Sequence, residues 1–203
     1  MKKYIIPGVI ALLAIVLFVN GRSTYNSMVT LGEDVDNAWA KVEVQYQRRM
    51  DLIPNIVETV KGYAAHESET YENVTRARAG LTDAYNEAGE LKNGATPADP
   101  GSFEKYNAAQ DRLNRALDIY VNAVREAYPD LKANTEFENL QTVLEGTENR
   151  IATERGRYTD IVKEYNVAVK RFPANIWAGI FGFSAKPQFK ADEAAATAPK
   201  VQF

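Results

Sequence analysis

The chain opens on a stretch in which apolar residues follow one another without a charged side chain. This stretch runs from Tyr4 to Val19 and lies between the basic pair Lys2-Lys3 and Arg22. As a helix it would be about 24 to 27 Å long, close to the hydrocarbon thickness of a bilayer. We therefore expect residues 1–22 to form a transmembrane anchor. Its main lipid-facing residues would be Tyr4, Ile5, Leu12, Leu13, Ile15, Val16, Leu17 and Phe18.

A cleaved signal peptide would share the basic start and the apolar middle of this segment. Such a peptide ends in a small-x-small cleavage site. The segment here ends in Phe18-Val19-Asn20-Gly21-Arg22, which offers no clean site of that kind. The pattern therefore favours an anchor that stays on the protein.

Beyond residue 22 the apolar positions recur at alternating steps of three and four, the spacing of one face of an α-helix. Pro54 interrupts this stripe, and a proline inside a helix removes a backbone hydrogen bond and clashes with the preceding turn. We expect a kink or a break in the helix between Asp51 and Asn55. The stripe consists of Met28, Val35, Trp39, Val42, Tyr46, Ile53, Ile56, Val60, Tyr63, Val74 and Leu81.

A second helical stripe follows a loop rich in glycine and proline, from Gly89 to Gly101. Thr96 or Ser102 is expected to cap the helix after this loop. The stripe runs from Phe103 to Val124. It should stop at Tyr128-Pro129, because the residue before a proline avoids the helical region.

The last long stripe runs from Phe137 to Phe172, and its helix is expected to begin at Thr135. Glu138 stands three residues after Thr135, which is the spacing of a capping box. No segment shows the sustained period-two alternation of a β-strand. The predicted fold is therefore all-α: an N-terminal transmembrane helix, then an antiparallel bundle of long helices over residues 23–173.

Residues 174–203 are expected to form a separate tail. Its segment from Ile176 to Phe183 is apolar and aromatic but too short to cross a bilayer. It could pack on the end of the bundle or rest in the membrane interface, where tryptophan is favoured. The small residues from 191 to 199 indicate a loosely ordered end.

The charge balance restricts the kinds of partner. The chain has 24 Lys and Arg against 27 Asp and Glu, and without Lys2, Lys3 and Arg22 the rest carries 21 against 27, a net charge of −6. An acidic body argues against nucleic acid as a partner. The basic residues before the span weakly favour a cytoplasmic N-terminus and an exported body.

Few residues suggest chemistry. His66 is the single histidine, and there is no cysteine, so a di-iron bundle site or a two-histidine zinc site has no second histidine. His66 with Glu58, Glu67 and Glu69 could suggest a metal site, but we favour the simpler interpretation of an exposed or capped histidine near a helix surface. We expect no catalytic site, no metal and no cofactor.

Charged residues on the seams of the predicted helices are the best candidate site. Arg49, Glu67 and Glu154 fall on the apolar stripes, where a charge must be paired or must reach water. They could form salt bridges between helices, or they could line a polar groove that recognises a partner. Solvated pairing or protein docking are likewise the two interpretations of the charged faces Glu148-Asn149-Arg150 and Arg155-Arg157.

Asp51, Pro54 and Asn55 form a second candidate, because a proline leaves one backbone carbonyl without its donor. Asp51 or Asn55 could satisfy the gap or offer it to a ligand. The alternative is a simple bend of the helix around the core. The combined partner-binding hypothesis therefore comprises Arg49, Asp51, Pro54, Asn55, His66, Glu67, Glu148, Asn149 and Arg150.

Two sequence blocks carry a resemblance to a known family. The first runs from Gln47 to Glu67 (QRRMDLIPNIVETVKGYAAHE), and the second from Gly146 to Ala152 (GTENRIA), continuing to Phe172-Pro173. Together with Tyr25-Asn26 and the closing PKVQF, they closely resemble the bacterial LemA family over essentially the whole chain. The resemblance implies a single-span membrane protein with a helical bundle, and it implies no enzymatic activity. The family's short N-terminus has been described as extracellular, opposite to the orientation that the charges favour.

These observations lead to one functional expectation and one alternative. We expect a non-enzymatic scaffold, adaptor or sensor at the bacterial cell envelope, held by one span in the cytoplasmic membrane. The alternative is a regulatory or substrate-delivery partner of a membrane protease, since members of the family are often encoded near such proteases. The expected partners are the lipid bilayer, an envelope protein of unknown identity and a second copy of the chain.

Overall fold

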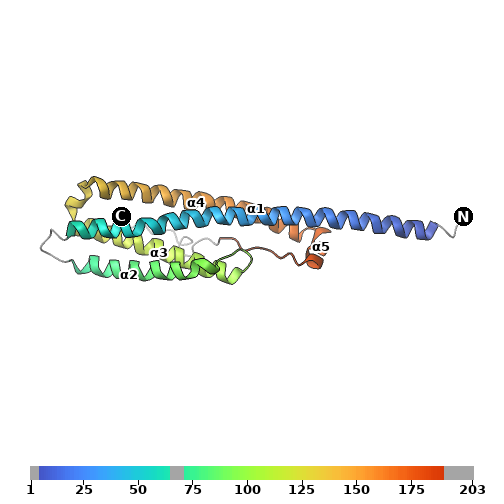
Figure 1. The fold of residues 1–203 in the computed structure, drawn as a ribbon, viewed down its shortest axis with the longest axis horizontal. Helices are drawn as coiled ribbons and strands as arrows, with labels where there is room; N and C mark the ends of the chain where they lie inside the picture. Colours follow the sequence, from blue (N-terminus) through green and yellow to red (C-terminus); the bar gives the residue numbers. More distant parts are fainter. Residues whose placement is uncertain (1–4, 65–70, 190–203) are drawn as a thin grey trace, which may run out of the picture. The chain divides into compact units, whose positions relative to one another are not determined.

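The structure is a computed structural model that describes residues 5–64 and 71–189 (Figure 1). Every regular element in these ranges is helical, which confirms the all-α prediction. The α-helices are α1 (Ile5–Ala64), α2 (Glu72–Leu91), α3 (Pro100–Ala127), α4 (Thr135–Lys170) and α5 (Ala174–Phe181), with two short 3₁₀ turns, η2 (Lys92–Gly94) and η3 (Pro129–Ala133). The chain forms two compact units: residues 34–157, and residues 1–33 with 158–203.

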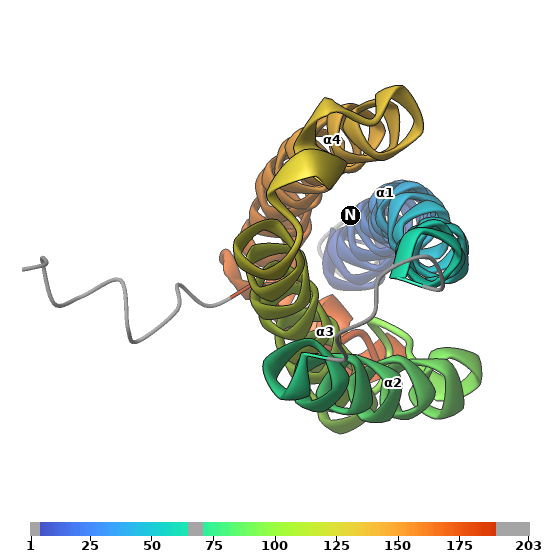
Figure 2. The ribbon, with the colours of Figure 1, turned by 90° about the vertical axis from the view of Figure 1, so that its left-hand side faces the viewer.

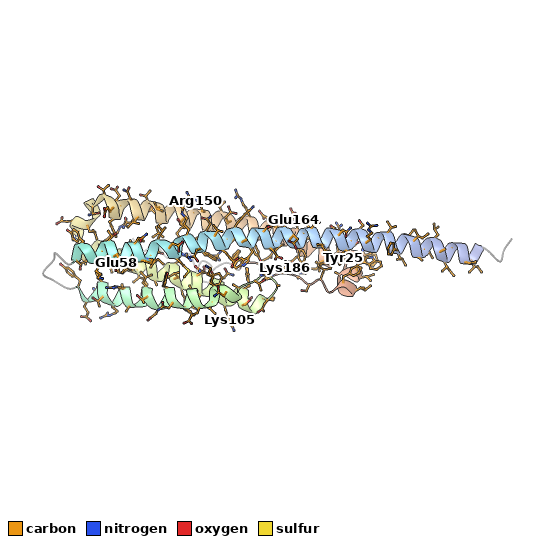
Figure 3. All side chains as sticks on the ribbon, viewed as in Figure 1. Tyr25, Glu58, Lys105, Arg150, Glu164 and Lys186 are labelled. Carbon is orange, nitrogen blue, oxygen red and sulfur yellow. The ribbon has the colours of Figure 1, made fainter. Side chains whose placement is uncertain are left out.

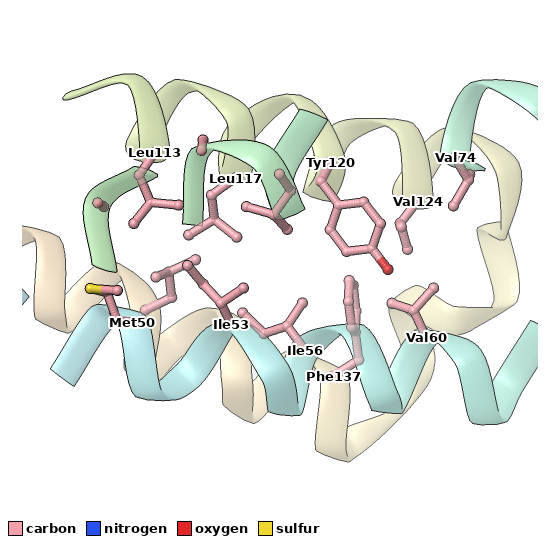
Figure 4. Packing of buried hydrophobic residues seen from close by; sticks show 14 of the residues in the cluster. Met50, Ile53, Ile56, Val60, Val74, Leu113, Leu117, Tyr120, Val124 and Phe137 are labelled. Atoms are coloured by element: carbon pink, nitrogen blue, oxygen red, sulfur yellow. The ribbon is translucent and has the colours of Figure 1, made fainter. Parts of the chain in front are cut away.

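The unit of residues 34–157 is an antiparallel bundle built from parts of α1 and α4 and from the whole of α2 and α3. Successive helices run in opposite directions (Figure 1), and Figure 2 shows them nearly end-on. The inward faces contribute a shared apolar core, part of which is drawn in Figure 4. Met50, Ile53, Ile56 and Val60 of α1 face Leu113, Leu117, Tyr120 and Val124 of α3, with Val74 from α2 and Phe137 from α4.

Two helix starts use a different residue from the one that the sequence suggested. The Asp99 carboxylate accepts from the Gly101 N–H at 3.0 Å and Pro100 follows, so Asp99 caps α3. Thr96 instead accepts from the Ala98 N–H within the loop. At α4 the Asn134 side chain accepts from the N–H groups of residues 136 and 137, so Asn134 performs the role expected of Thr135. In both cases a carboxylate or amide one to three residues away had the better reach.

Pro54 does not break the helix that contains it. α1 runs without interruption from Ile5 to Ala64, so of the two predicted outcomes near Asp51 to Asn55 the break is wrong, and the kink stays a prediction. A long helix packed on both sides of a proline keeps more hydrogen bonds than the proline removes. The stripe from Met28 to Leu81 is divided further on, because Val74 and Leu81 belong to α2.

In the unit of residues 1–33 and 158–203, α5 and the segment after it pack on α1 and α4. The Tyr25 ring meets the rings of Phe181 and Phe183 edge-on, with centroids 5.1 and 5.6 Å away. Gly182 ends α5 in the left-handed conformation, with a φ of 78°, and turns the chain back toward α1. The apolar tail segment is therefore a packed helix, and residues 191–199 lie outside the described range.

The segment after α5 is held along α4 by side-chain hydrogen bonds. Asn166 donates to the Lys186 carbonyl at 2.9 Å and accepts from its N–H at 2.8 Å. The Tyr158 hydroxyl donates to the Pro187 carbonyl at 2.9 Å. Lys186 in turn donates to the Gly32 carbonyl of α1 at 3.3 Å. Phe172, expected on the inner stripe of α4, is instead 80% exposed, because α4 ends two residues earlier, at Lys170.

None of the described residues covers the first turns of α1. Six of the predicted anchor residues are more than half exposed, from Val16 at 54% to Phe18 at 71%, the others being Leu12, Leu13, Ile15 and Leu17. Tyr4 and the Ile5 side chain lie outside what is described. Within the described ranges, α1 is the one helix long and apolar enough to cross a membrane.

Replacing Pro54 by alanine should stabilise the bundle. Pro54 is exposed within α1, so the change restores a backbone donor for the Met50 carbonyl without altering the core. We expect the free energy of unfolding to rise by up to about 3 kcal/mol, measured by circular dichroism on the full chain in detergent. Asn55→Ala, at the next exposed position, is the control and should change it by less than about 0.7 kcal/mol. A destabilising Pro54→Ala would show that the proline itself is required.

Candidate functional site

A buried arginine joins three helices of the 34–157 unit. Arg49, on α1, is only 2% exposed. One terminal nitrogen donates to Gln110 on α3, to its carbonyl at 2.9 Å and to its side-chain oxygen at 2.6 Å. The other donates to the Glu148 carboxylate of α4 at 3.1 Å and to the Asn114 side chain at 3.3 Å. A single guanidinium therefore ties α1 to both α3 and α4.

Further polar side chains continue this arrangement along α3. The buried Tyr46 hydroxyl donates to the Asn107 side-chain oxygen at 3.0 Å. The Asn107 amide nitrogen donates in turn to the Phe103 carbonyl at 2.7 Å. The Arg49 guanidinium lies 5.4 Å from the centroid of the Tyr46 ring, within cation–π distance. We call Arg49, Tyr46, Asn107, Gln110 and Glu148 the Arg49 cluster.

Aromatic rings surround the cluster on the side of Trp39. The Trp39 ring lies 4.9 Å from Phe103 and 6.2 Å from Tyr106, centroid to centroid. Tyr46 and Tyr106 meet edge-on at 5.8 Å. Such pairs keep water out and lower the local dielectric constant, which strengthens the charged hydrogen bonds of Arg49.

Burial changes the ionisation of the groups nearby. It raises the pKa of Tyr106 to about 12, although a hydrogen bond with Gln110 opposes the change. Burial also raises the pKa of Tyr46, against the opposing charges of Arg155 and Arg49. The pKa of Glu43 is raised by burial too, opposed by Lys92 and by a hydrogen bond with Trp39. Both phenols are therefore protonated at neutral pH, and the Tyr46 hydroxyl is a hydrogen-bond donor to Asn107.

This arrangement suits a structural bond between helices better than it suits chemistry. Both terminal nitrogens of Arg49 are engaged by protein acceptors, and its Nε atom is buried without a hydrogen-bond partner among the described residues. Among the described residues, Glu148 is the one carboxylate that pairs directly with the guanidinium, and its side chain is 31% exposed. Over residues 5–64 and 71–189, no group of three or more metal-ligating side chains lies close enough to hold an ion.

The structure brings together two of the nine residues in the partner-binding hypothesis, Arg49 and Glu148. Asp51 is exposed and accepts a hydrogen bond from Gln47 one turn earlier. His66 and Glu67 lie outside the described residues. The remaining four are exposed on the surfaces of α1 and α4, where Figure 3 labels one of them, Arg150: they are Pro54, Asn55, Asn149 and Arg150.

The salt-bridge interpretation is confirmed for Arg49 and wrong for Glu154. Glu154 pairs with Arg157 three residues along α4, at 2.6 Å, and so links no second helix. The expectation of a purely solvated face is also wrong, because Arg155 reaches across to Asp111 of α3 at 2.9 Å. The ion-pair partner of a long side chain depends on which helix packs beside it, so the sequence of its own helix does not predict the partner.

Sequence analysis missed the acceptors on α3. Asn107 and Gln110 are buried, as are the apolar residues of the second stripe. The signal was present, since Phe103, Tyr106, Gln110 and Leu113 follow one another at steps of three and four. The apolar residues alone defined the stripe, so the polar residues Asn107 and Gln110 beside them were not predicted to be buried.

Comparison with known proteins agrees with the resemblance seen in the sequence. The model of the LemA family matches residues 38–203. The chain belongs to the LemA family. Magnetosome protein MamQ 2 of Paramagnetospirillum magneticum is 30% identical over 193 residues, covering 90% of this chain and 71% of the relative. Magnetosome protein MamQ of Magnetospirillum gryphiswaldense is 28% identical over 191 residues, covering 89% and 70%.

Removing the Arg49 side chain should destabilise this LemA-family bundle strongly. Arg49→Ala leaves the buried Gln110 acceptors and the Glu148 carboxylate without their donor. We expect a loss of about 3 kcal/mol, the lower end of the range for a broken buried pair, because Glu148 still reaches water. The measurement is denaturant unfolding of the full chain in detergent. Arg48→Ala, at the exposed neighbouring position, should change stability by no more than about 0.5 kcal/mol.

The raised pKa of Tyr106 predicts a loss of stability at high pH. An unfolded tyrosine loses its proton near pH 10, whereas folded Tyr106 keeps its proton to about pH 12. The free energy of unfolding should therefore be unaffected by this group below pH 10 and should fall as the pH rises from 10 to 12. Tyr106→Phe should make that fall shallower while its effect stays constant from pH 7 to 9. An equal slope in both proteins would show that Tyr106 ionises alike in the folded and unfolded states.

Proposed function

We propose that this LemA-family protein is a non-enzymatic adaptor held in the bacterial cytoplasmic membrane by the first turns of α1. The observation that carries the proposal is the contrast in what covers α1. Its residues from Ile6 to Val19 are exposed and apolar, whereas from Val35 on its inner face is buried in a bundle. One continuous helix therefore serves as both a membrane anchor and a bundle element.

The use of the buried polar groups supports a binding role over catalysis. The donors of Arg49 are used in hydrogen bonds between helices, and the phenols of Tyr46 and Tyr106 are protonated at neutral pH. In such a bundle, the side chains that can contact a partner lie on the outer surface. A membrane-anchored bundle of this kind brings a partner to the bilayer surface and needs no reaction of its own.

The outer surface between α2 and α3 is one candidate binding surface for a partner. A groove of about 520 Å³ lies there, with the small residues Ala77, Gly80 and Ala116 in its lining together with polar and charged side chains. Ile119 is 61% exposed at its edge and gives the groove a large apolar side chain that a partner can contact. The charged surface of α4 around Arg150 is the second such place.

Two other roles compete with a general adaptor. The names of the relatives favour a magnetosome-related role, because the two relatives described above are called magnetosome proteins. A regulatory or substrate-delivery role with a membrane protease is the other candidate. All of these make the protein a binding partner, and the identity of the bound protein separates them.

Photo-crosslinking in intact membranes tests the proposal. A crosslinking amino acid is placed at Ile119, at Arg150 and, as a control, at the exposed Thr82 of α2. We expect one envelope protein to be captured repeatedly from Ile119 or Arg150 and not from Thr82. A protease or a magnetosome protein would select the corresponding role, and capture of the chain alone would indicate a homo-oligomeric scaffold. Equal, non-specific capture from all three positions would contradict an adaptor function.

A further inference from the structure

α5 is a short helix with two different apolar faces. Its inner face is formed by Ala174, Trp177 and Ala178, spaced as one side of a helix, and the two alanines are 8% and 2% exposed. Its outer face carries Ile176 and Ile180, which are 53% and 64% exposed. A helix whose outer side is made of isoleucine is unusual on a surface in contact with water.

The inner face of α5 attaches it to α1 just where the apolar run ends. The Trp177 ring packs directly on Gly21, two residues after Val19. A β-carbon at position 21 would stand 3.0 Å from that ring, so any larger residue there would require the ring to move back by a few tenths of an ångström. Phe181 and Tyr25 add an edge-on ring contact at 5.1 Å. Figure 3, in which Tyr25 is labelled, shows α5 beside this part of α1.

The position of α5 relative to a bilayer follows from that contact. If residues 4–19 occupy the hydrocarbon, Gly21 and Tyr25 stand at the level of the lipid headgroups. Trp177, seated on Gly21, then lies at the same level. Tryptophan and tyrosine are enriched at this depth of a membrane, because their rings are apolar at one end and polar at the other.

The sequence around α5 has the charge pattern of an interfacial segment. Residues 172–185 contain no charged side chain, and they are bounded by Lys170-Arg171 on one side and Lys186 on the other. A helix of eight residues is about 12 Å long, far too short to cross the hydrocarbon. Apolar side chains flanked by basic residues suit a helix that lies in the plane of the interface.

We propose that α5 is a second membrane contact, which lies at the boundary of headgroups and acyl chains beside the exit of α1. Ile176 and Ile180 enter the lipid, while Trp177 and Phe181 hold the helix against α1. Phe172, two residues before α5, is a further large apolar side chain that is 80% exposed. The inference rests on the proposed membrane anchor. It adds a second membrane contact about 150 residues later in the sequence, so one contact precedes residues 23–173 and the other follows them.

Site-directed spin labelling of the full chain tests this contact, because the chain has no cysteine of its own. Single cysteines replace Ile180, Leu13 and Val44 in separate variants. Val44 is the matched control, since it is 62% exposed, almost as much as Ile180, yet belongs to the bundle. Each labelled protein is placed in nanodiscs of phosphatidylcholine and phosphatidylglycerol. The label's collisions with oxygen, which enters lipid, are compared with its collisions with a nickel chelate, which stays in water.

We expect the label at Ile180→Cys to collide mainly with oxygen, as at Leu13→Cys, and the label at Val44→Cys to collide mainly with the nickel chelate. If Ile180→Cys behaves like Val44→Cys while Leu13→Cys stays in lipid, α5 is not a membrane contact and the anchor still stands. If Leu13→Cys is also in water, the anchor itself is wrong.

A second copy of the chain could cover α5 in place of lipid. The label at position 180 would then be shielded from both reagents and would broaden through spin–spin coupling between chains, a result that overturns the proposal. Ile176→Cys repeats the measurement one turn earlier on the same face, in case the label at position 180 disturbs folding.

Discussion

The bundle of residues 34–157 depends on the guanidinium of Arg49. Moving an arginine from water into an apolar interior costs several kcal/mol unless its charge and its donors are matched. Here Gln110, Asn114 and Glu148 supply the acceptors from two other helices. Because hydrogen bonds are directional, the match holds only at one axial position of α1 against α3 and α4. Apolar contacts such as Ile56 with its neighbours stabilise the bundle but tolerate sliding, so the register depends on the polar contact.

The same logic explains why the polar interior is narrow and set among aromatic rings. Trp39, Phe103 and Tyr106 occupy one side of the Arg49 cluster, and the apolar core of Met50, Ile53 and their partners continues on the other. Water excluded by these side chains would otherwise compete for the acceptors of Arg49. The polar residues therefore specify how the helices align, and the apolar residues around them supply most of the buried surface.

A different constraint acts on the unit of residues 1–33 and 158–203. There the chain after α4 is held by polar contacts that belong to its own backbone: Asn166 brackets the peptide of Lys186, and Tyr158 binds the Pro187 carbonyl. An extended segment has no internal hydrogen bonds, so side chains of α4 satisfy it. This attachment, together with Trp177 on Gly21, holds α5 close to the apolar start of α1. A LemA-family chain thus keeps its last described segment beside its first.

Sequence alone determined the helical class, the apolar segment at the start of α1 and the approximate ends of α3 and α4, because these depend on local periodicity, on proline and on the length of an apolar run. It also marked Arg49 as a charge that needs a partner. It could not show that Gln110 and Glu148 are that partner, that Glu154 turns to its own helix, or that Trp177 rests on Gly21. Those outcomes depend on which helices become neighbours and at what axial offset. The axial offset between two helices is set by the side chains that pack between them, so it cannot be derived from the sequence of either helix alone. Pro54 shows the converse: the local rule for proline allowed a break, but α1 continues through it, because packing on both sides of Pro54 outweighs one lost hydrogen bond.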